Sequence, residues 1–108
     1  MNKEELQSMS FQLVAHAGEA SAYFYEAYHV VAKSGSYEEA NEKLELGDKA
    51  IVEAHEAQTD LLRAEVAGED IAFSILLMHA QDHLMTTALL GRMAREFISV
   101  YKEMRHED

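Results

Sequence analysis

The chain has 108 residues, contains no proline, cysteine or tryptophan, and carries a formal net charge of -11. One domain fits this length, which leaves no room for a separate nucleotide-binding domain. Without cysteine there is no disulfide, no thiolate-bound metal and no thiol nucleophile, and so acidic a chain is unsuited to binding a nucleic-acid backbone.

The apolar runs are shorter than the roughly 20 residues that a membrane-spanning helix requires. The first residues, Met1-Asn2-Lys3-Glu4-Glu5, lack the apolar segment of a signal peptide. We therefore expect a cytoplasmic chain that does not insert into a membrane.

The first helix is expected at about residues 3–33, where apolar and small residues recur at steps of three and four. Nothing interrupts helical hydrogen bonding in a chain without proline. The segment Ser34-Gly35-Ser36 should end this helix, because glycine readily adopts the left-handed conformation of a helix end. The sequence thus places the first turn near residue 35.

The second helix is expected at about residues 37–67 and begins at a capping box formed by Ser36 and Glu39. A second turn at Gly68-Glu69-Asp70 follows, with Asp70 as the N-cap of a third helix at about residues 71–106. Such short connections predict an all-α fold, an up-down-up antiparallel three-helix bundle within a single domain of residues 1–108. We interpret Gly18 and Gly91, inside helices, as points of close contact between helices.

The third helix carries more apolar side chains than one intramolecular core can cover. Its central stripe consists of Ile75, Met78, Asp82, Met85, Leu89 and Met93, and further apolar or aromatic residues beside it or away from it are Phe73, Leu77, Leu84, Leu90, Phe97 and Tyr101. An apolar strip that remains uncovered usually marks an interface. A homo-oligomer is therefore expected.

The six histidines differ in their surroundings. His16 lies on the inner stripe of the first helix and is interpreted as a core histidine with a hydrogen-bond partner, whereas three others have acidic neighbours and are interpreted as surface or rim residues: His29, His55 and His106. In the third helix, His79-Ala80-Gln81-Asp82-His83 places two imidazoles one turn apart, with a carboxylate close to both.

Asp82 and Gln58 interrupt apolar stripes. A carboxylate in a stripe is costly unless it is protonated, paired with a cation, bound to a metal or exposed to a wet cavity, so a functional role is favoured for Asp82. Gln58 is either a polar core residue that fixes the helix register or a support for His79 or His83.

The cluster around His79 and His83 has three possible uses. A metal site could use both imidazoles and Asp82, although the Glu of an HExxH motif is missing. A di-iron bundle could use the pairs Glu26 with His29 and Glu103 with His106, but a fourth helix is missing. A nucleophilic histidine needs an exposed nitrogen and donors for phosphoryl oxygens, which Gln81 and His83 could supply, and it needs a donor protein because no nucleotide loop is present.

The run Met78-His79-Ala80-Gln81-Asp82-His83-Leu84-Met85-Thr86-Thr87 resembles the signature of the enzyme IIA component of the lactose/cellobiose class of the bacterial phosphoenolpyruvate-dependent sugar phosphotransferase system (PTS). The segments Ala15-His16-Ala17-Gly18-Glu19-Ala20 and Ala54-His55-Glu56-Ala57-Gln58-Thr59 resemble the motifs of that family's first two helices, and Gly68-Glu69-Asp70 resembles its second turn. The resemblance therefore covers nearly the whole chain.

This resemblance implies a homotrimeric phosphocarrier. By the family's pattern, His79 accepts a phosphoryl group from the phosphocarrier HPr and passes it to a cysteine of enzyme IIB, during uptake of a β-linked disaccharide of the cellobiose, lactose or chitobiose type. Asp82 falls on the position that binds Mg²⁺ or a similar cation on the three-fold axis, one per trimer, while Gln81 and His83 match the signature as supporting donors. The alternatives are a non-catalytic helical adaptor trimer and a metal-dependent helical-bundle enzyme.

Overall fold

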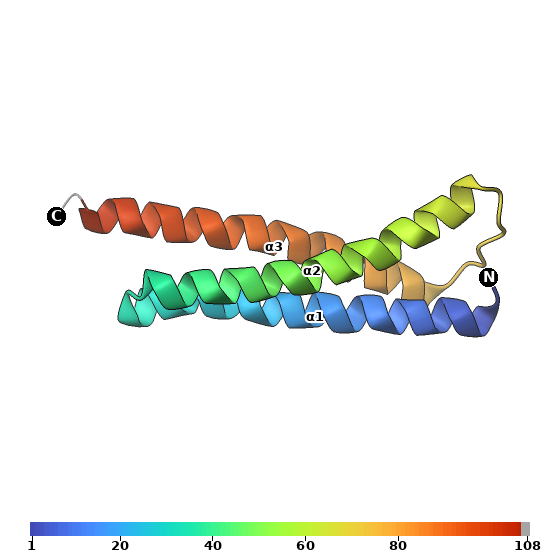
Figure 1. Cartoon of the computed structure of the whole chain (residues 1–108), viewed down its shortest axis with the longest axis horizontal. Helices are drawn as coiled ribbons and strands as arrows, with labels where there is room; N and C mark the ends of the chain where they lie inside the picture. The colour runs from blue at the N-terminus through green and yellow to red at the C-terminus, as the bar shows by residue number, and fades with distance from the viewer. Residues whose placement is uncertain (107–108) are drawn as a thin grey trace.

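The computed structural model describes residues 1–106, with only the backbone described for the last of them. These residues form three helices and no strand: α1 (Lys3–Ser34), α2 (Tyr37–Val66) and α3 (Ile75–His106). They run up, down and up along a rod of 58 × 20 × 19 Å (Figure 1). The predicted all-helical fold is confirmed.

The turn between α1 and α2 has the predicted chemistry. Gly35 adopts the left-handed conformation, with φ 71° and ψ 14°, and its backbone N–H donates to the carbonyl oxygen of Val31. Ser36 caps α2, because its side-chain oxygen accepts a hydrogen bond from the backbone N–H of Glu39 at 3.3 Å. These contacts satisfy backbone groups that helix ends leave without an intrahelical partner.

The start of α3 differs from the prediction. Asp70 does not cap a helix at residue 71, since α3 begins at Ile75. The N-cap is Ser74, whose Oγ accepts a hydrogen bond from the backbone N–H of Leu77 at 3.2 Å. Gly68, with φ 89°, follows the end of α2, and the chain needs residues 69–74 to reach the third helix. The helix therefore starts about one turn later than expected.

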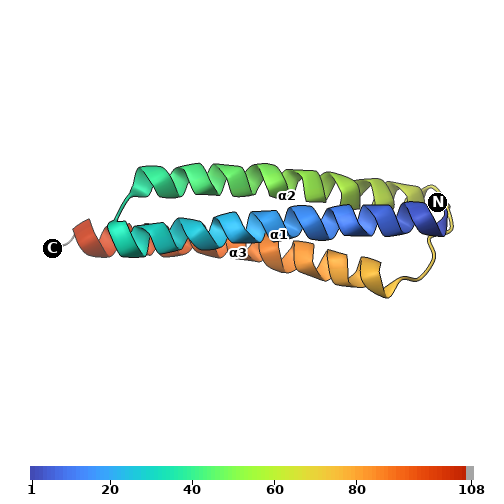
Figure 2. The ribbon, with the colours of Figure 1, turned by 90° about the horizontal axis from the view of Figure 1, so that it is seen from below.

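The core is organised around α1, which packs against both other helices, while α2 and α3 contact each other much less. Figure 2 shows α1 lying between α2 and α3 where these two diverge. The ring of Phe24, only 1% exposed, fills the space between α2 and α3 and approaches Gly47 on one and Gly91 on the other. A Cβ at Gly91 would lie 2.8 Å from the ring, so the predicted close contact at this glycine is confirmed.

The other expected glycine contact is wrong, because a Cβ added at Gly18 would meet no atom within 4 Å. The buried face of α1 also differs in part from the predicted stripe. The sequence predicts a stripe of Leu6, Met9, Leu13, His16, Ala20, Tyr23, Ala27 and Val30. Four of these positions are buried as expected, and the other four buried positions lie one residue later: Ser10, Ala17, Phe24 and Val31. Serine can be buried there because its Oγ donates to the carbonyl oxygen of Leu6 at 2.8 Å.

The largest difference concerns the face that α3 turns to the core. The apolar stripe through Asp82 is exposed in the single chain: Ile75 is 76% exposed and Met85 59% exposed. The core is instead contacted by Leu77, Ala80, Leu84, Thr87, Gly91, Ala94 and Ile98. Of the apolar residues expected beside the stripe, Leu77 and Leu84 are thus buried, whereas Phe73 and Phe97 are exposed.

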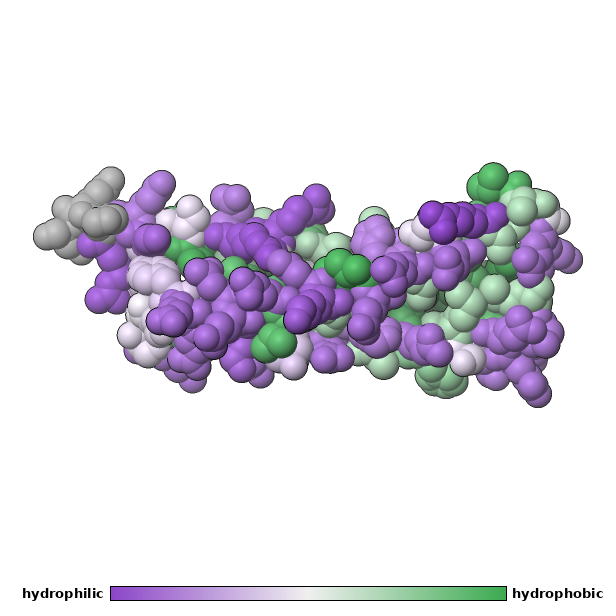
Figure 3. Space-filling model, in the orientation of Figure 1, coloured by the Kyte–Doolittle hydropathy of each residue, from purple (hydrophilic) through white to green (hydrophobic). Residues whose placement is uncertain are grey.

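The molecular surface is polar along much of the face in Figure 3, and apolar side chains gather at the end that holds the α2–α3 connection. None of the three helices described in residues 1–106 has an apolar stretch that could span a bilayer.

Candidate functional site

The run from His79 to His83 occupies the second and third turns of α3, soon after the Ser74 cap. The imidazole rings of His79 and His83 lie one turn apart, with 6.1 Å between their centroids. His79 is exposed, and His83 is half-buried. The structure therefore brings the two histidines together and leaves His79 open to a partner molecule.

The ring of His83 is held with one nitrogen inside the protein. Its Nδ1 is buried and has no hydrogen-bond partner among the described residues. A buried N–H group without an acceptor is costlier than an unpaired acceptor, which folded proteins tolerate somewhat more often. The geometry therefore favours the neutral tautomer with its proton on Nε2, which leaves Nε2 as a hydrogen-bond donor.

Gln81 does not join the two histidines. It is half-buried on the side of α3 that faces α2, where its Oε1 accepts a hydrogen bond from Nε2 of Gln58 at 3.4 Å. Gln58 itself is 9% exposed. Of the two interpretations of Gln58, the structure agrees with a polar core residue between α2 and α3, since its partner is Gln81 and not His79 or His83. The sequence already indicated that Gln81 points away from both histidines. It lies two residues from each of them, and side chains two residues apart on a helix point about 200° apart.

Asp82 is exposed, so the burial that its place in an apolar stripe suggested does not occur in the single chain. Its backbone is fixed by Thr86, whose Oγ1 donates to the carbonyl oxygens of Asp82 and His83 at 3.0 and 3.2 Å. The carboxylate stands in the middle of an exposed apolar face. The carboxylate of Asp82 therefore needs a cation or a hydrogen-bond donor only when another molecule covers this face.

The described residues contain no group of three or more His, Asp or Glu side chains that could hold a metal ion. The structure therefore does not gather His79, Asp82 and His83 into such a group. A di-iron bundle would use Glu26 and His29 together as ligands. In the structure Glu26 pairs with Lys43 at 3.1 Å, and this contact raises the pKa of Lys43. The Nδ1 of His29 donates to the carbonyl oxygen of Tyr25 at 3.0 Å.

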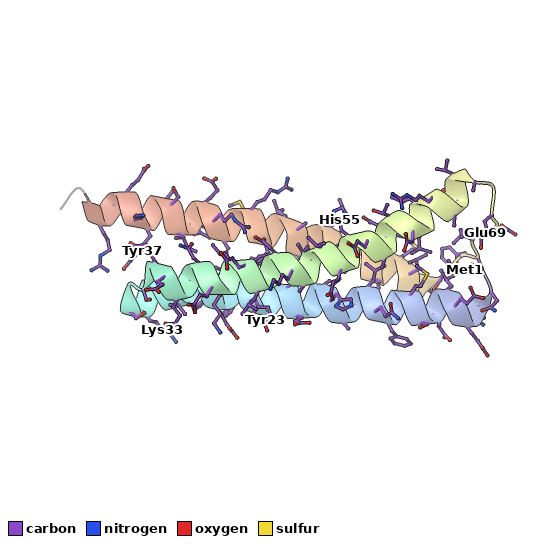
Figure 4. The ribbon with its side chains drawn as sticks, viewed as in Figure 1. Met1, Tyr23, Lys33, Tyr37, His55 and Glu69 are labelled. Atoms are coloured by element: carbon purple, nitrogen blue, oxygen red, sulfur yellow. The ribbon has the colours of Figure 1, made fainter. Side chains whose placement is uncertain are left out.

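The remaining histidines lie away from the cluster. His16 is half-buried at the edge of the core, and its Nδ1 lies 3.1 Å from a carboxylate oxygen of Glu53 on α2. His55 projects from the middle of α2 (Figure 4), where it is exposed beside a groove of about 400 Å³ between α2 and α3. The side chain of His106, and with it the second Glu-His pair, lies outside the described residues.

Sequence comparison gives one family. The profile described as "PTS system, Lactose/Cellobiose specific IIA subunit" matches residues 8–102. A "PTS system lactose-specific EIIA component" of Staphylococcus aureus is 46% identical over 102 residues, which cover 94% of this chain and 98% of that protein. The protein with the same description from Streptococcus mutans is also 46% identical over 102 residues, with 94% and 97% coverage.

Solved structures agree with this result. The crystal structure of the PTS cellobiose-specific enzyme IIA from Bacillus anthracis superposes with a TM-score of 0.90 at 38% identity, covering all of this chain and 96% of that one. The crystal structure of PtcA from S. mutans gives 0.91 at 39% identity, with 94% and 99% coverage. The chain therefore belongs to the lactose/cellobiose-specific IIA subunits of the PTS and is a component of a sugar phosphotransferase system.

Proposed function

We propose that this chain is a cytoplasmic phosphohistidine carrier, with His79 as the nucleophile. The observation that carries the proposal is the exposed ring of His79. It lies one helical turn from the imidazole of His83, whose Nε2–H can donate a hydrogen bond. A lone pair on the imidazole attacks phosphorus, a new N–P bond forms, and the N–P bond to the histidine of HPr breaks. The leaving imidazole of HPr keeps the electron pair.

The phosphoryl group then moves on to enzyme IIB. The thiolate of its cysteine attacks phosphorus, an S–P bond forms, and the N–P bond to His79 breaks, which returns the imidazole to its starting state. Nε2–H of His83 can donate to a phosphoryl oxygen on its neighbour throughout both steps, since an N–H group needs no proton transfer to stabilise an anion.

The sugar class follows from the relatives and not from a feature of this chain. Two relatives are named for lactose and one for cellobiose, and both sugars are β-linked disaccharides. We therefore propose uptake of a β-linked disaccharide of the lactose, cellobiose or chitobiose type.

We also propose that three copies assemble through the exposed stripe of α3. All its apolar members are exposed: Ile75, Met78, Met85, Leu89 and Met93. Exposed Val100 and Met104 continue the stripe toward the end of the helix. An uncovered face of this length is unusual for a monomer and typical of an interface. In such an assembly the stripe turns toward the symmetry axis, and so does each Asp82.

A divalent cation fits that arrangement. The described residues of one chain contain no group of three donors, so a site at the level of Asp82 would need this carboxylate from all three copies. Carboxylate oxygens are the ligands that Mg²⁺ and Ca²⁺ prefer. The cation would offset three converging negative charges, which otherwise oppose association.

The experiment is reconstitution with phosphoenolpyruvate, enzyme I and HPr, followed by mass spectrometry at neutral pH. One acid-labile phosphoryl group per chain is expected, and none in His79→Ala. Glu53→Gln, at a residue of α2 that contacts His16, is a control that should label normally. An unlabelled native chain would favour a helical adaptor trimer, and metal-dependent turnover without the PTS proteins would favour a metal-dependent enzyme.

A further inference from the structure

A groove of about 400 Å³ lies between α2 and α3, and neither His79 nor His83 lines it. It is found where the ring of Phe24 separates the two helices, next to Gly91. Binding sites for small molecules have volumes of about 300–1,000 Å³. The groove is therefore large enough to hold a small organic molecule.

The charge of this groove is opposite in sign to that of the chain. Two arginines, Arg92 and Arg95, line it together with one carboxylate, that of Asp48, so two positive charges minus one negative charge give +1 when His55 is counted as neutral. The whole chain carries -11 on the same count. A cleft lined by positive charge concentrates anions, and the groove is therefore suited to an anionic ligand.

Arg95 and Asp48 satisfy each other. Nη2 of Arg95 donates a hydrogen bond to Oδ2 of Asp48, and Nη1 donates to the carbonyl oxygen of Gly91 at 3.3 Å. The guanidinium carbon also lies 5.9 Å from the centre of the Phe24 ring. Arg95 thus links α3 to α2, and it neutralises the carboxylate that would otherwise repel an anion in the groove.

Arg92 and His55 remain free to contact a ligand. Both side chains are exposed, and no carboxylate oxygen of the described residues lies within 4.0 Å of a nitrogen of either one. Arg92 comes from α3 and His55 from α2, so the donors stand on opposite walls. A guanidinium group binds phosphate through two parallel N–H bonds, and a neutral imidazole supplies one more N–H. Three terminal oxygens of a phosphate monoester can accept all of these bonds.

The rest of the lining is largely apolar. Ile51 contributes from α2, and Met85 and Ala88 contribute from α3. Inorganic phosphate would leave these side chains uncovered and most of the volume unused. A sugar ring presents C–H groups on its faces, which can cover apolar side chains while its hydroxyl groups stay in water. A phosphorylated sugar therefore matches the volume, the charge and the apolar lining together.

We propose that this groove binds a phosphorylated sugar, with Arg92 and His55 on the phosphate and the apolar side chains against the sugar. A sugar phosphotransferase system releases compounds of this class as its products. The inference rests on membership of such a system and goes beyond the proposed transfer through His79. It makes the product of the system a ligand of one of its own components.

The groove lies on a different face of α3 from the proposed trimer interface. Arg92 is about 80° around the helix from Asp82, and Ala88 about 120° in the same direction. Only Met85, about 60° from Asp82, belongs both to the stripe and to the groove. We therefore expect the assembled protein to bind the ligand.

Calorimetric and ¹⁵N NMR titrations of the native protein, without HPr, test the site with three probes: lactose 6-phosphate, lactose and inorganic phosphate. Lactose 6-phosphate should bind at least about 10-fold more tightly than inorganic phosphate, because the sugar also buries apolar surface. Lactose alone should show no measurable binding. The amide signals that move should belong to residues 48–55 and 85–95.

Three results of these titrations would overturn the inference. Equal affinity for lactose 6-phosphate and inorganic phosphate would reject the sugar. Signal changes confined to the surroundings of His79 and His83 would place the anion at the candidate functional site. No binding by the native protein would reject the site, whether a neighbouring copy fills the groove or the groove lacks affinity.

Arg92→Gln tests the phosphate contact, and it should weaken binding about 10- to 100-fold, as expected for a hydrogen bond to a charged group. His55→Ala should weaken binding about 2- to 10-fold, as expected for a neutral donor. Arg105→Gln is the matched control, because it removes the same charge about 20 Å further along α3. Circular dichroism checks that each variant is folded. Native affinity in Arg92→Gln, or an equal loss in Arg105→Gln, would contradict the proposed site.

The proposed function has a separate outcome, because labelling of His79 is measured with HPr and without sugar phosphate. A native chain that binds lactose 6-phosphate in the groove but takes no phosphoryl group would contradict the phosphocarrier function alone. A native chain that is labelled on His79 but binds no lactose 6-phosphate would overturn this inference alone.

Discussion

The contact of Phe24 with two glycines gives a prediction that can be worked out from distances. A Cβ at Gly47 would lie 2.5 and 2.7 Å from ring carbons of Phe24, and one at Gly91 would lie 2.8 Å from two of them. Ordinary contacts to a Cβ are about 3.4–4 Å, so each alanine forces the ring to move by several tenths of an ångström. Because the other glycine lies near the opposite side of the ring, movement away from one helix brings the ring against the other.

The expected size of the effect is a balance of two terms. Overpacking a core costs about 1–3 kcal/mol. Replacing a glycine inside a helix by alanine returns up to about 1 kcal/mol of helix propensity. Gly47→Ala and Gly91→Ala should therefore reduce the free energy of unfolding by about 0–2 kcal/mol, with the larger loss at Gly47.

Gly18→Ala is the matched control, since a Cβ there meets nothing within 4 Å and only the gain in propensity remains. It should raise the free energy of unfolding by about 1 kcal/mol. Urea unfolding at one fixed protein concentration, followed by circular dichroism, measures all three variants. If the alanines at residues 47 and 91 stabilised the protein as much as the one at residue 18, the ring would not be the spacer between α2 and α3.

Three further predictions concern the cap, the stripe and the site. Ser74→Ala should lower the free energy of unfolding by about 1 kcal/mol through loss of the N-cap, with Asp70→Ala nearly neutral, and equal losses would contradict the observed start of α3. Asp82→Leu should retain a trimer but bind no divalent cation by equilibrium dialysis, and metal at native stoichiometry would reject the axial site. In ¹⁵N NMR spectra of the neutral imidazole, His83 should show a protonated Nε2, and a protonated Nδ1 would contradict the tautomer inferred from the burial of that atom.

Local chemistry made most of the fold predictable. The left-handed Gly35 and the cap at Ser36 are read directly from residue types, because each supplies a backbone conformation or an acceptor that a helix end needs. Asp70 and Ser74 are both good N-cap residues. Only the path of the connection after Gly68 decided between them, and that path depends on tertiary contacts.

The face of α3 was harder to predict for a physical reason. Periodicity finds apolar stripes, and the stripe with the larger side chains is the more conspicuous. In α3 that stripe is the exposed one, while much of the buried face consists of small residues such as Ala80, Gly91 and Ala94. Small residues suit close packing on α1, yet they carry little hydrophobic signal.

The candidate site was located by its motif, but its organisation was not. The sequence correctly singled out His79 and His83 as neighbours, because an interval of four residues is one helical turn. It grouped Gln81 with them only by proximity along the chain. The partner of Gln81 is Gln58, 23 residues away in sequence, and such a contact depends on how α2 and α3 are placed by the helix between them.

The elongated shape separates the chemistry from the far end of the rod. His79 lies in the early turns of α3, and the helix continues for about 40 Å beyond it, at 1.5 Å per residue. Figure 1 shows the two ends of α3 at opposite parts of the molecule. A fluorescent protein or affinity handle joined after α3 would therefore stand well clear of any molecule docked at His79, which makes that end the better choice for tethering the protein in single-molecule transfer experiments.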